Sequence, residues 1–186
     1  MKNKKAFAIS ASVIVIAIAA TIAVFFVIAA GRPTAIGGSV YKDSLLLQSF
    51  YDYPQSISRI LPTTYGLTDE QSKSVLNDKG EWNAYTLDVA VNNKSKDNIT
   101  LYTFEVKNNG KNDVWISKVA NNSAGIVSGN IETISISVLV KGKDVSAETA
   151  AAAIKKYSIK IGYSKTPTKN SQGVESIEKH KIINVK

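Results

Sequence analysis

The side chains of this sequence with the most chemical potential are carboxylates. Glycoside hydrolysis requires two of them facing one cleft, and candidates occur at Asp43, Asp52, Asp69, Glu70, Asp78, Glu81, Asp88 and Glu105. No motif brings two of them together. The only histidine, His180, lies in the charged stretch Glu178-Lys179-His180-Lys181, a poor place for an oriented base, and one histidine cannot build a histidine metal site. The sequence therefore predicts no catalytic residue, no metal and no cofactor.

Two short motifs resemble functional signals. Asn77-Asp78-Lys79-Gly80-Glu81 lacks the alternating oxygen ligands of an EF-hand, so we interpret it as a turn. Leu61-Pro62-Thr63-Thr64-Tyr65 is similar to a sortase signal. Tyr65 replaces the glycine of that signal, and no hydrophobic stretch with a basic tail follows at the C-terminus. We therefore reject sorting to the cell wall.

Three asparagines, Asn93, Asn98 and Asn121, begin triplets of the glycosylation acceptor pattern in expected loops. Such triplets also arise by chance in an asparagine-rich chain, and the reading gains weight only for an archaeal source. Trp115 alternates with Val114 and Ile116, so it faces outward if those two face the core. It is then a possible contact residue; the alternative is packing under the N-terminal segment.

These residues follow an uncharged, predominantly apolar run over residues 6–30, which comes directly after Lys2, Lys4 and Lys5. A helix of that length covers about 37 Å, enough to span a bilayer. The lysines of residues 1–5 predict a cytoplasmic N-terminus and an extracytoplasmic remainder. Because the run is longer than the apolar core of a signal peptide, we expect an uncleaved signal anchor. Cleavage near Ala30, after small residues, stays open.

The amino-acid composition limits which cellular compartment and which classes of partner suit the protein. The chain has no cysteine, which excludes disulfides, thiolate metal sites and lipid anchoring through cysteine. An exported domain without disulfides indicates a bacterial or archaeal surface. The net charge of the chain is +8, and three of its lysines lie in residues 1–5, so the exported part carries about +5 (20 Lys and Arg less 15 Asp and Glu). That charge modestly favours anionic partners such as cell-wall polyanions or lipid headgroups. Nucleic acid does not suit the location.

The exported part divides into three regions. Residues 31–39 are rich in Gly and Pro and predict a stalk. Residues 40–80 predict a membrane-proximal, partly helical segment, in which Pro54 and Pro62 leave a short helix followed by irregular chain. Thr68 and Gln71 then form a capping box that opens a helix to about Asn77. In this region Leu45, Leu46 and Leu47 suit either a donor strand or a helix packed on its own domain.

Residues 81–186 switch to a period of two, the pattern of half-buried strands. In residues 131–141, Ile134, Ile136, Val138 and Val140 point one way while Ser135 and Ser137 point the other. Asn108-Asn109-Gly110 predicts a tight hairpin turn with residues 114–119 as its return strand. Residues 147–156 predict a helix that joins strands at one end, and residues 182–185 an edge strand. The fold class expected is mainly β, an antiparallel β-sandwich with one or two short helices after the transmembrane helix.

Four segments, 87–93 (LDVAVNN), 104–106 (FEV), Ser128-Gly129 and 134–138 (ISISV), resemble the telokin-like, immunoglobulin-fold ectodomains of bacterial membrane-anchored surface proteins. Those carry a Val-x-Val-x-Asn strand and a Pro-Gly turn before an alternating strand; Ser128 stands where the proline is usual. The resemblance implies an immunoglobulin-like fold and transfers no catalytic residue.

The sequence thus predicts a non-catalytic, membrane-anchored surface protein. The lipid bilayer is its partner through residues 6–30, and its domain binds or scaffolds a protein or a cell-wall polyanion. The alternative is a signal-cleaved structural subunit whose residues 35–47 add as a strand to a neighbour and build a filament.

Overall fold

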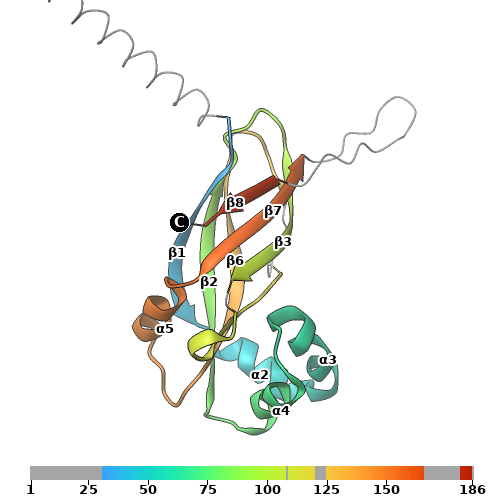
Figure 1. The fold of residues 1–186 in the computed structure, drawn as a ribbon, viewed down its shortest axis with the longest axis vertical. Coiled ribbons are helices and arrows are strands. Elements are labelled where there is room, and N and C mark those ends of the chain that lie inside the picture. The colour runs from blue at the N-terminus through green and yellow to red at the C-terminus, as the bar shows by residue number, and fades with distance from the viewer. Residues whose placement is uncertain (1–30, 108, 120–124, 166–180, 186) are drawn as a thin grey trace, which may run out of the picture.

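The computed structural model describes residues 31–107, 109–119, 125–165 and 181–185, which form a mainly β fold with two antiparallel sheets (Figure 1). The first sheet has the order β1 (Thr34–Lys42), β2 (Trp82–Asn92), β6 (Ile131–Lys141), β4 (Val114–Ile116). The second has the order β5 (Gly125–Ile126), β3 (Ile99–Lys107), β7 (Ser158–Lys165), β8 (Lys181–Asn184). Sequence neighbours β2 and β3 lie in different sheets, so the chain crosses repeatedly between the two.

One hydrophobic core lies between the sheets. Ile134, Ile136, Val138 and Val140 of β6 are buried in it, which confirms the predicted alternation. The second sheet contributes residues such as Phe104 and Ile161 to the same cluster. Side chains alternate between the two faces of a strand, so each period-two strand turns one apolar face to this core.

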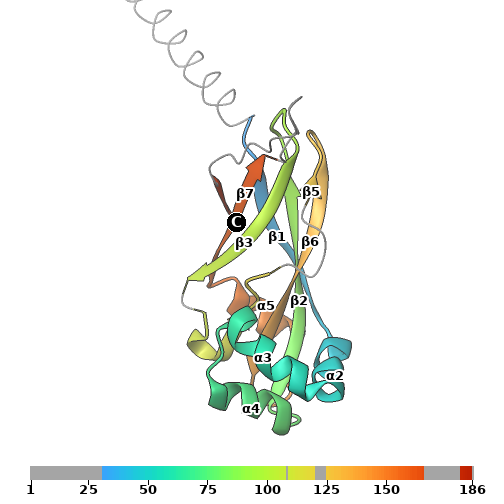
Figure 2. The same ribbon diagram turned by 90° about the vertical axis from the view of Figure 1, so that its right-hand side faces the viewer.

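Three helices gather at one end of the molecule, as Figure 2 shows: α2 (Ser44–Asp52), α3 (Pro54–Tyr65) and α4 (Asp69–Asn77). The Asp43 carboxylate accepts from the Leu46 amide and caps α2. The predicted capping box of Thr68 and Gln71 is confirmed at the start of α4. The fourth helix, α5 (Ala147–Ile154), connects β6 to β7 and confirms the expected crossover.

The expectation that Pro54 and Pro62 leave a short helix followed by irregular chain was wrong. Pro54 occupies the first turn of α3, where its fixed φ suits a helix and no amide is needed. The helix continues through Pro62 and ends at Gly66, which adopts φ +75° as a left-handed C-cap.

The region expected as a stalk forms a strand instead. β1 pairs with β2 from Thr34↔Asn92 to Lys42↔Tyr85, with a register shift between Gly37 and Val40. The two glycines obscure the alternation that would mark a strand in the sequence. Because β1 runs the length of the sheet, it carries the chain from Gly31 to the opposite end before α2 begins (Figure 1). The helices of residues 40–80 therefore lie at the end of the domain away from Gly31, whereas a membrane-proximal segment was expected at the same end as Gly31.

The hairpin expected at residues 108–110 is also absent as such. β3 pairs with β5 and β7, whereas β4 pairs with β6 in the other sheet. Gly110 does adopt the positive φ that a tight turn needs, +83°. The turn at this position was therefore predicted correctly, but the pairing of the two strands that flank it was not.

Within the described ranges, no helix is long and apolar enough to cross a membrane. The apolar run of residues 6–30 lies outside those ranges. The expected edge strand at the C-terminal end is confirmed as β8, the outer strand of the second sheet.

Candidate functional site

The three helices α2, α3 and α4, here called the helical cap, cover the outer face of the first sheet at one end. A second hydrophobic cluster lies beneath them. The sheet contributes Trp82, Ala84, Trp115 and Leu139, and the cap contributes Phe50, Leu61, Tyr65 and Val75, with Leu67 from the α3–α4 connection. The cap is therefore a separate layer that packs on the sheet through this second hydrophobic cluster.

Trp115 lies inside this cluster, only 4 % exposed, and its ring centroid is 5.0 Å from that of Trp82. As expected, Val114 and Ile116 face the inter-sheet core, so Trp115 does point the other way. That face is covered by the cap, however, and the proposed contact role for Trp115 is wrong. The alternative, packing under the N-terminal segment, is confirmed. Gly110 lies so close that a Cβ there would come within 2.6 Å of the indole Nε1.

Polar contacts fix the cap in place. Asn109 Nδ2 donates to the carbonyls of Tyr65 (2.8 Å) and Ile116 (3.0 Å), and its Oδ1 accepts from the Ile116 amide (2.7 Å). One side chain thus joins the end of α3 to β4. On the other side, Trp82 Nε1 donates to Ser74 Oγ of α4 at 3.0 Å.

The Tyr65 hydroxyl is buried against the sheet, 2.7 Å from Ser137 Oγ. Burial raises the pKa of Tyr65 to about 12; the Asp43 charge acts in the same direction and the Ser137 hydrogen bond in the opposite one. The residue that ends the sortase-like motif is therefore part of the link between cap and sheet.

The outer surface of the cap exposes large apolar side chains. Leu45 is 81 % exposed, Tyr53 67 % and Ile60 46 %. Tyr53 is the residue between α2 and α3, and Ile60 lies on α3. Leu45, Leu46 and Leu47 lie in α2, and the latter two pack against the second cluster. Of the two expected arrangements for these leucines, the helix packed on its own domain is the one observed.

The glycosylation candidates lie in different surroundings. Asn93 is fully buried, and its Nδ2 donates to the carbonyls of Asp97 (2.8 Å) and Ile126 (3.1 Å). It holds the β2–β3 turn and is not accessible for modification in the fold. Asn98 is exposed, and its Oδ1 accepts from the Ser128 amide. Asn121 lies outside the described residues.

The structure does not assemble the candidate carboxylates into a metal-binding group: among the residues described, no three acidic or histidine side chains cluster. Asp88 accepts from Ser135 and Ser39, and Asp43 accepts from Thr86 besides capping α2. Asp78 accepts from Ser74 at 2.6 Å in the turn that follows α4. His180 falls outside the described ranges.

Two hollows lie elsewhere on the surface. One of about 330 Å³ runs between β1, α5 and β7 and is lined mostly by apolar residues such as Val40, Ile154 and Val185. The other, of about 720 Å³, lies at the end that carries Gly31 and is lined by Arg32, Lys94, Lys96 and Lys165.

Neither set of exposed residues, the cations at one end or Tyr53 and Ile60 at the other, was predicted from the sequence. A signal for the cations was present, because Lys94 and Lys96 lie within the expected loop that contains Asn93 and Asn98, and Arg32 follows the apolar run closely. No comparable signal marked Tyr53 or Ile60.

No family model and no curated protein sequence matches this chain. Among solved structures, a FixG-related protein from Vibrio parahaemolyticus is similar over 82 % of this chain and 96 % of its own, at 18 % identity. The TM-score of that match is 0.23, which is too low to carry an argument about fold or function.

Proposed function

We propose that this chain is a membrane-anchored, non-catalytic binding module with an immunoglobulin-like β-sandwich. The strand order supports the fold: β1, β2, β6 and β4 correspond to strands A, B, E and D, and β3, β7 and β8 to C, F and G. The shared core between the two sheets is the one such a sandwich requires. β5 is an additional short strand at the edge beside C.

The anchor gives the domain an orientation. Residues 6–30 span the membrane, and β1 begins only at Thr34, so the end carrying Gly31 is held at the bilayer. β2 has 11 residues, which extend about 35 Å in a strand. The helical cap therefore stands at the far end of the domain, presented to the surroundings.

The observation that carries the binding role is the apolar surface of the cap. Leu45 on α2, Tyr53 between α2 and α3, and Ile60 on α3 are exposed, and a buried tryptophan cluster and the Asn109 hydrogen bonds attach the cap to the sheet. Exposed aliphatic and aromatic side chains on a rigid support are typical of protein-binding surfaces. The partner is accordingly another envelope protein with a complementary apolar surface.

The test is photocrosslinking in the native membrane. A benzophenone amino acid replaces Tyr53, and in a matched chain it replaces Ile36, which is 60 % exposed on β1. We expect one discrete adduct from position 53 and none from position 36. Leu45→Asp with Ile60→Asp should abolish the adduct, because a carboxylate at an apolar contact loses its hydration.

Ile36→Asp is the control for the added charge and should leave the adduct at position 53 unchanged. An adduct formed equally from both positions would show non-specific proximity. An adduct from position 36 alone would move the binding surface to the sheet and contradict the role of the cap.

The filament alternative requires residues 35–47 to leave their own domain. Eight of those residues, 35–42, already belong to β1, which pairs with β2, and Leu45, Leu46 and Leu47 belong to α2. A donor strand would have to break this pairing and unfold the helix. These contacts favour the anchored module over the filament.

A further inference from the structure

The end of the domain that carries Gly31 gathers positive charge. Its hollow is lined by Arg32, Lys94, Lys96 and Lys165, and the one carboxylate in the lining is Asp97. Asp97 pairs with Lys165 at 3.1 Å, and both side chains stay partly exposed. These four cations, here called the basic end, therefore retain a net charge of +3 with Asp97 included.

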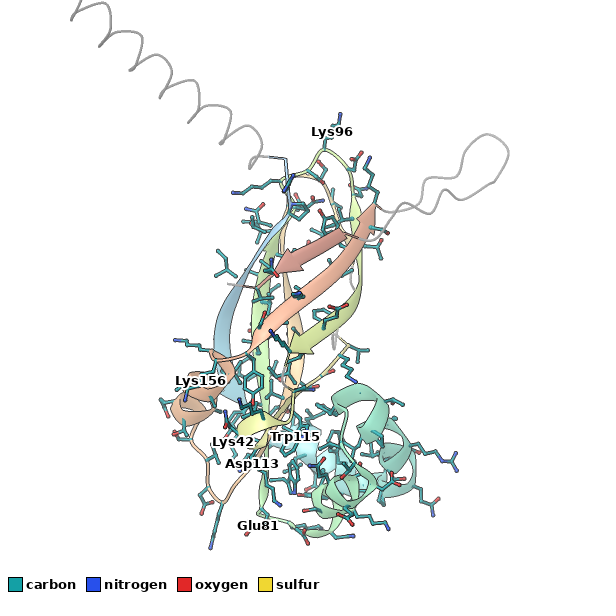
Figure 3. All side chains as sticks on the ribbon, in the orientation of Figure 1. Lys42, Glu81, Lys96, Asp113, Trp115 and Lys156 are labelled. Atoms are coloured by element: carbon teal, nitrogen blue, oxygen red, sulfur yellow. The ribbon has the colours of Figure 1, made fainter. Side chains whose placement is uncertain are left out.

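Three separate parts of the chain supply the basic end. Arg32 precedes β1, Lys94 and Lys96 lie in the β2–β3 turn, and Lys165 ends β7. The pairs Thr34↔Asn92 and Ile99↔Lys165 bring these segments to the same end. Lys96 stands at the extreme tip, beside the start of β1 (Figure 3).

The turn that carries the two lysines is held by Asn93. Its buried amide bonds the carbonyls of Asp97 and Ile126, and Ser95 Oγ donates to its Oδ1 at 2.6 Å. Lys94 and Lys96 are both exposed on this fixed turn. The lysines thus project from a support whose backbone has little freedom to retract.

Exposed apolar residues accompany the charge. Ile131 is 62 % exposed and Val127 53 %. The register Asn92↔Ile131 places Ile131 at this end, and the hydrogen bond from the Asn130 amide to the Val127 carbonyl keeps Val127 in the adjoining turn. Residues 44–81 at the other end contain five carboxylates and three cations, a net charge of −2. The basic end is therefore more positive than the segment that forms the helical cap.

We infer that the basic end docks on the phosphate groups of anionic lipids in the membrane that holds residues 6–30. The inference rests on the proposed anchor. Residues 31–33 extend at most about 10 Å, close to one Debye length at physiological salt. Each lysine near an anionic surface strengthens association about fivefold, and Ile131 and Val127 can contact the interfacial region. The docked domain stands upright with the helical cap outward.

The chain has no cysteine, so a single fluorophore can report this contact. Asn130→Cys, exposed just before β6, is labelled in the full chain and reconstituted into vesicles that contain a nitroxide on a lipid headgroup. We expect stronger quenching with about 30 % phosphatidylglycerol than with phosphatidylcholine alone, and a loss of the difference at about 0.5 M salt. A label at Asn77→Cys, on α4 at the other end, should show no such difference.

Charge variants make the test specific. Lys94→Gln with Lys96→Gln should lower the docked-to-free ratio about 25-fold. The control, Lys73→Gln with Lys143→Gln, removes the same charge from exposed lysines away from the basic end and should change nothing. Equal quenching in neutral and anionic vesicles, or equal effects of the two variants, would overturn the inference.

Two further measurements distinguish lipid from free phosphate and docking from anchoring. If inorganic phosphate abolishes the quenching and chloride of equal ionic strength does not, the basic end binds free phosphate and the lipid assignment fails. Flotation of the full chain with neutral vesicles tests the anchor independently. A chain that floats without lipid-dependent quenching retains the anchor and lacks the docking; a chain that fails to float with neutral vesicles lacks the anchor.

Discussion

At the scale of single residues, Trp115 and Asn93 show that residue type and spacing do not determine role. The alternation around Trp115 correctly gives the direction of its side chain, and yet the helical cap buries it at 4 % exposure. Asn93 begins a glycosylation triplet, and yet its amide is the internal support of a turn. In both cases a segment distant in sequence determines the surroundings of the residue.

Trp115→Ala should destabilise the fold by about 3–5 kcal/mol, because it empties the space beneath the cap and exposes Trp82 to a cavity. Urea unfolding of the full chain in detergent, followed by circular dichroism, measures the loss. Leu45→Ala, at an 81 % exposed position, is the control and should stay within about 0.5 kcal/mol. A similar small effect of Trp115→Ala would mean that the cap is not packed on the sheet.

Tyr65 should make the fold sensitive to alkaline pH. Its pKa is about 12 in the fold and near 10 in an unfolded chain, so above pH 10 the unfolded state loses the proton first. The contribution is fully present below pH 10 and falls as pH rises towards 12, by about 2–3 kcal/mol in all.

Tyr65→Phe should cost about 1 kcal/mol at neutral pH, since Ser137 loses its partner, and it lacks the alkaline component. Urea unfolding at a series of pH values from 8 to about 11 compares the two chains. The stability difference between them should shrink and then reverse as pH rises. A difference that is constant with pH would contradict the burial of this hydroxyl.

At the scale of elements, sequence patterns correctly predicted the features that depend on residues close together in the chain. The alternation in β6 and the capping box at Thr68 and Gln71 were confirmed, because each depends on neighbours within one strand or one turn. The predictions of a stalk at residues 31–39 and of a hairpin at residues 108–110 were wrong. β1 contains two glycines that weaken its pattern, and the Gly110 turn has the same φ in a crossover as in a hairpin. Which strands pair is decided between segments far apart in sequence.

The candidate site was harder to predict than the fold for the same reason. Whether Tyr53 and Ile60 are exposed depends on which face of α3 covers Leu139 and Trp115 of the sheet, and no sequence period carries that choice. The lysines of the basic end were individually visible. Their convergence required the pairing of β1, β2, β3 and β7.

Asn109→Ala should loosen the cap as a unit. The substitution removes three hydrogen bonds to the Tyr65 and Ile116 backbone, worth about 2–3 kcal/mol together. Hydrogen exchange should accelerate in α3 and β4 and remain slow in β3 and β7. Asn77→Ala, at an exposed helix end, is the matched control and should leave exchange unchanged; uniform acceleration across both sheets would mean that cap and sheets unfold together.

At the scale of the whole molecule, the two ends of the domain differ in charge and in the exposed side chains that they offer to a partner. The end with Gly31 is cationic, and the other carries the helical cap with its exposed apolar side chains; residues 44–81, which form the cap, have a net charge of −2. The longest strands between the two ends, β2 and β6, have 11 residues each and extend about 35 Å. Such a domain suits a protein that is held at a membrane by one end and binds its partner with the other. This arrangement requires that residues 6–30 stay in the bilayer.

Intact mass from the native membrane tests that retention. We expect a mass near 20.0 kDa, less an initiator methionine where it is removed. The apolar run is longer than the core that signal peptidase substrates carry, and the folded strand β1 begins only a few residues beyond it. A mass lower by about 3 kDa would instead show cleavage near Ala30, at the small residues that resemble a cleavage site. That result would favour the filament alternative over the anchored module.

Topology is the complementary prediction. Lys2, Lys4 and Lys5 precede the apolar run and only Arg32 follows it closely, so the positive-inside rule places residue 3 in the cytoplasm and the folded domain outside. In intact cells, Asn77→Cys on the cap should react with a membrane-impermeant maleimide, and Asn3→Cys should react only after permeabilisation. The chain has no other cysteine, so each signal has one source. The opposite pattern would place the cap in the cytoplasm, where an envelope partner could not reach it, and the proposed function would fail with the orientation.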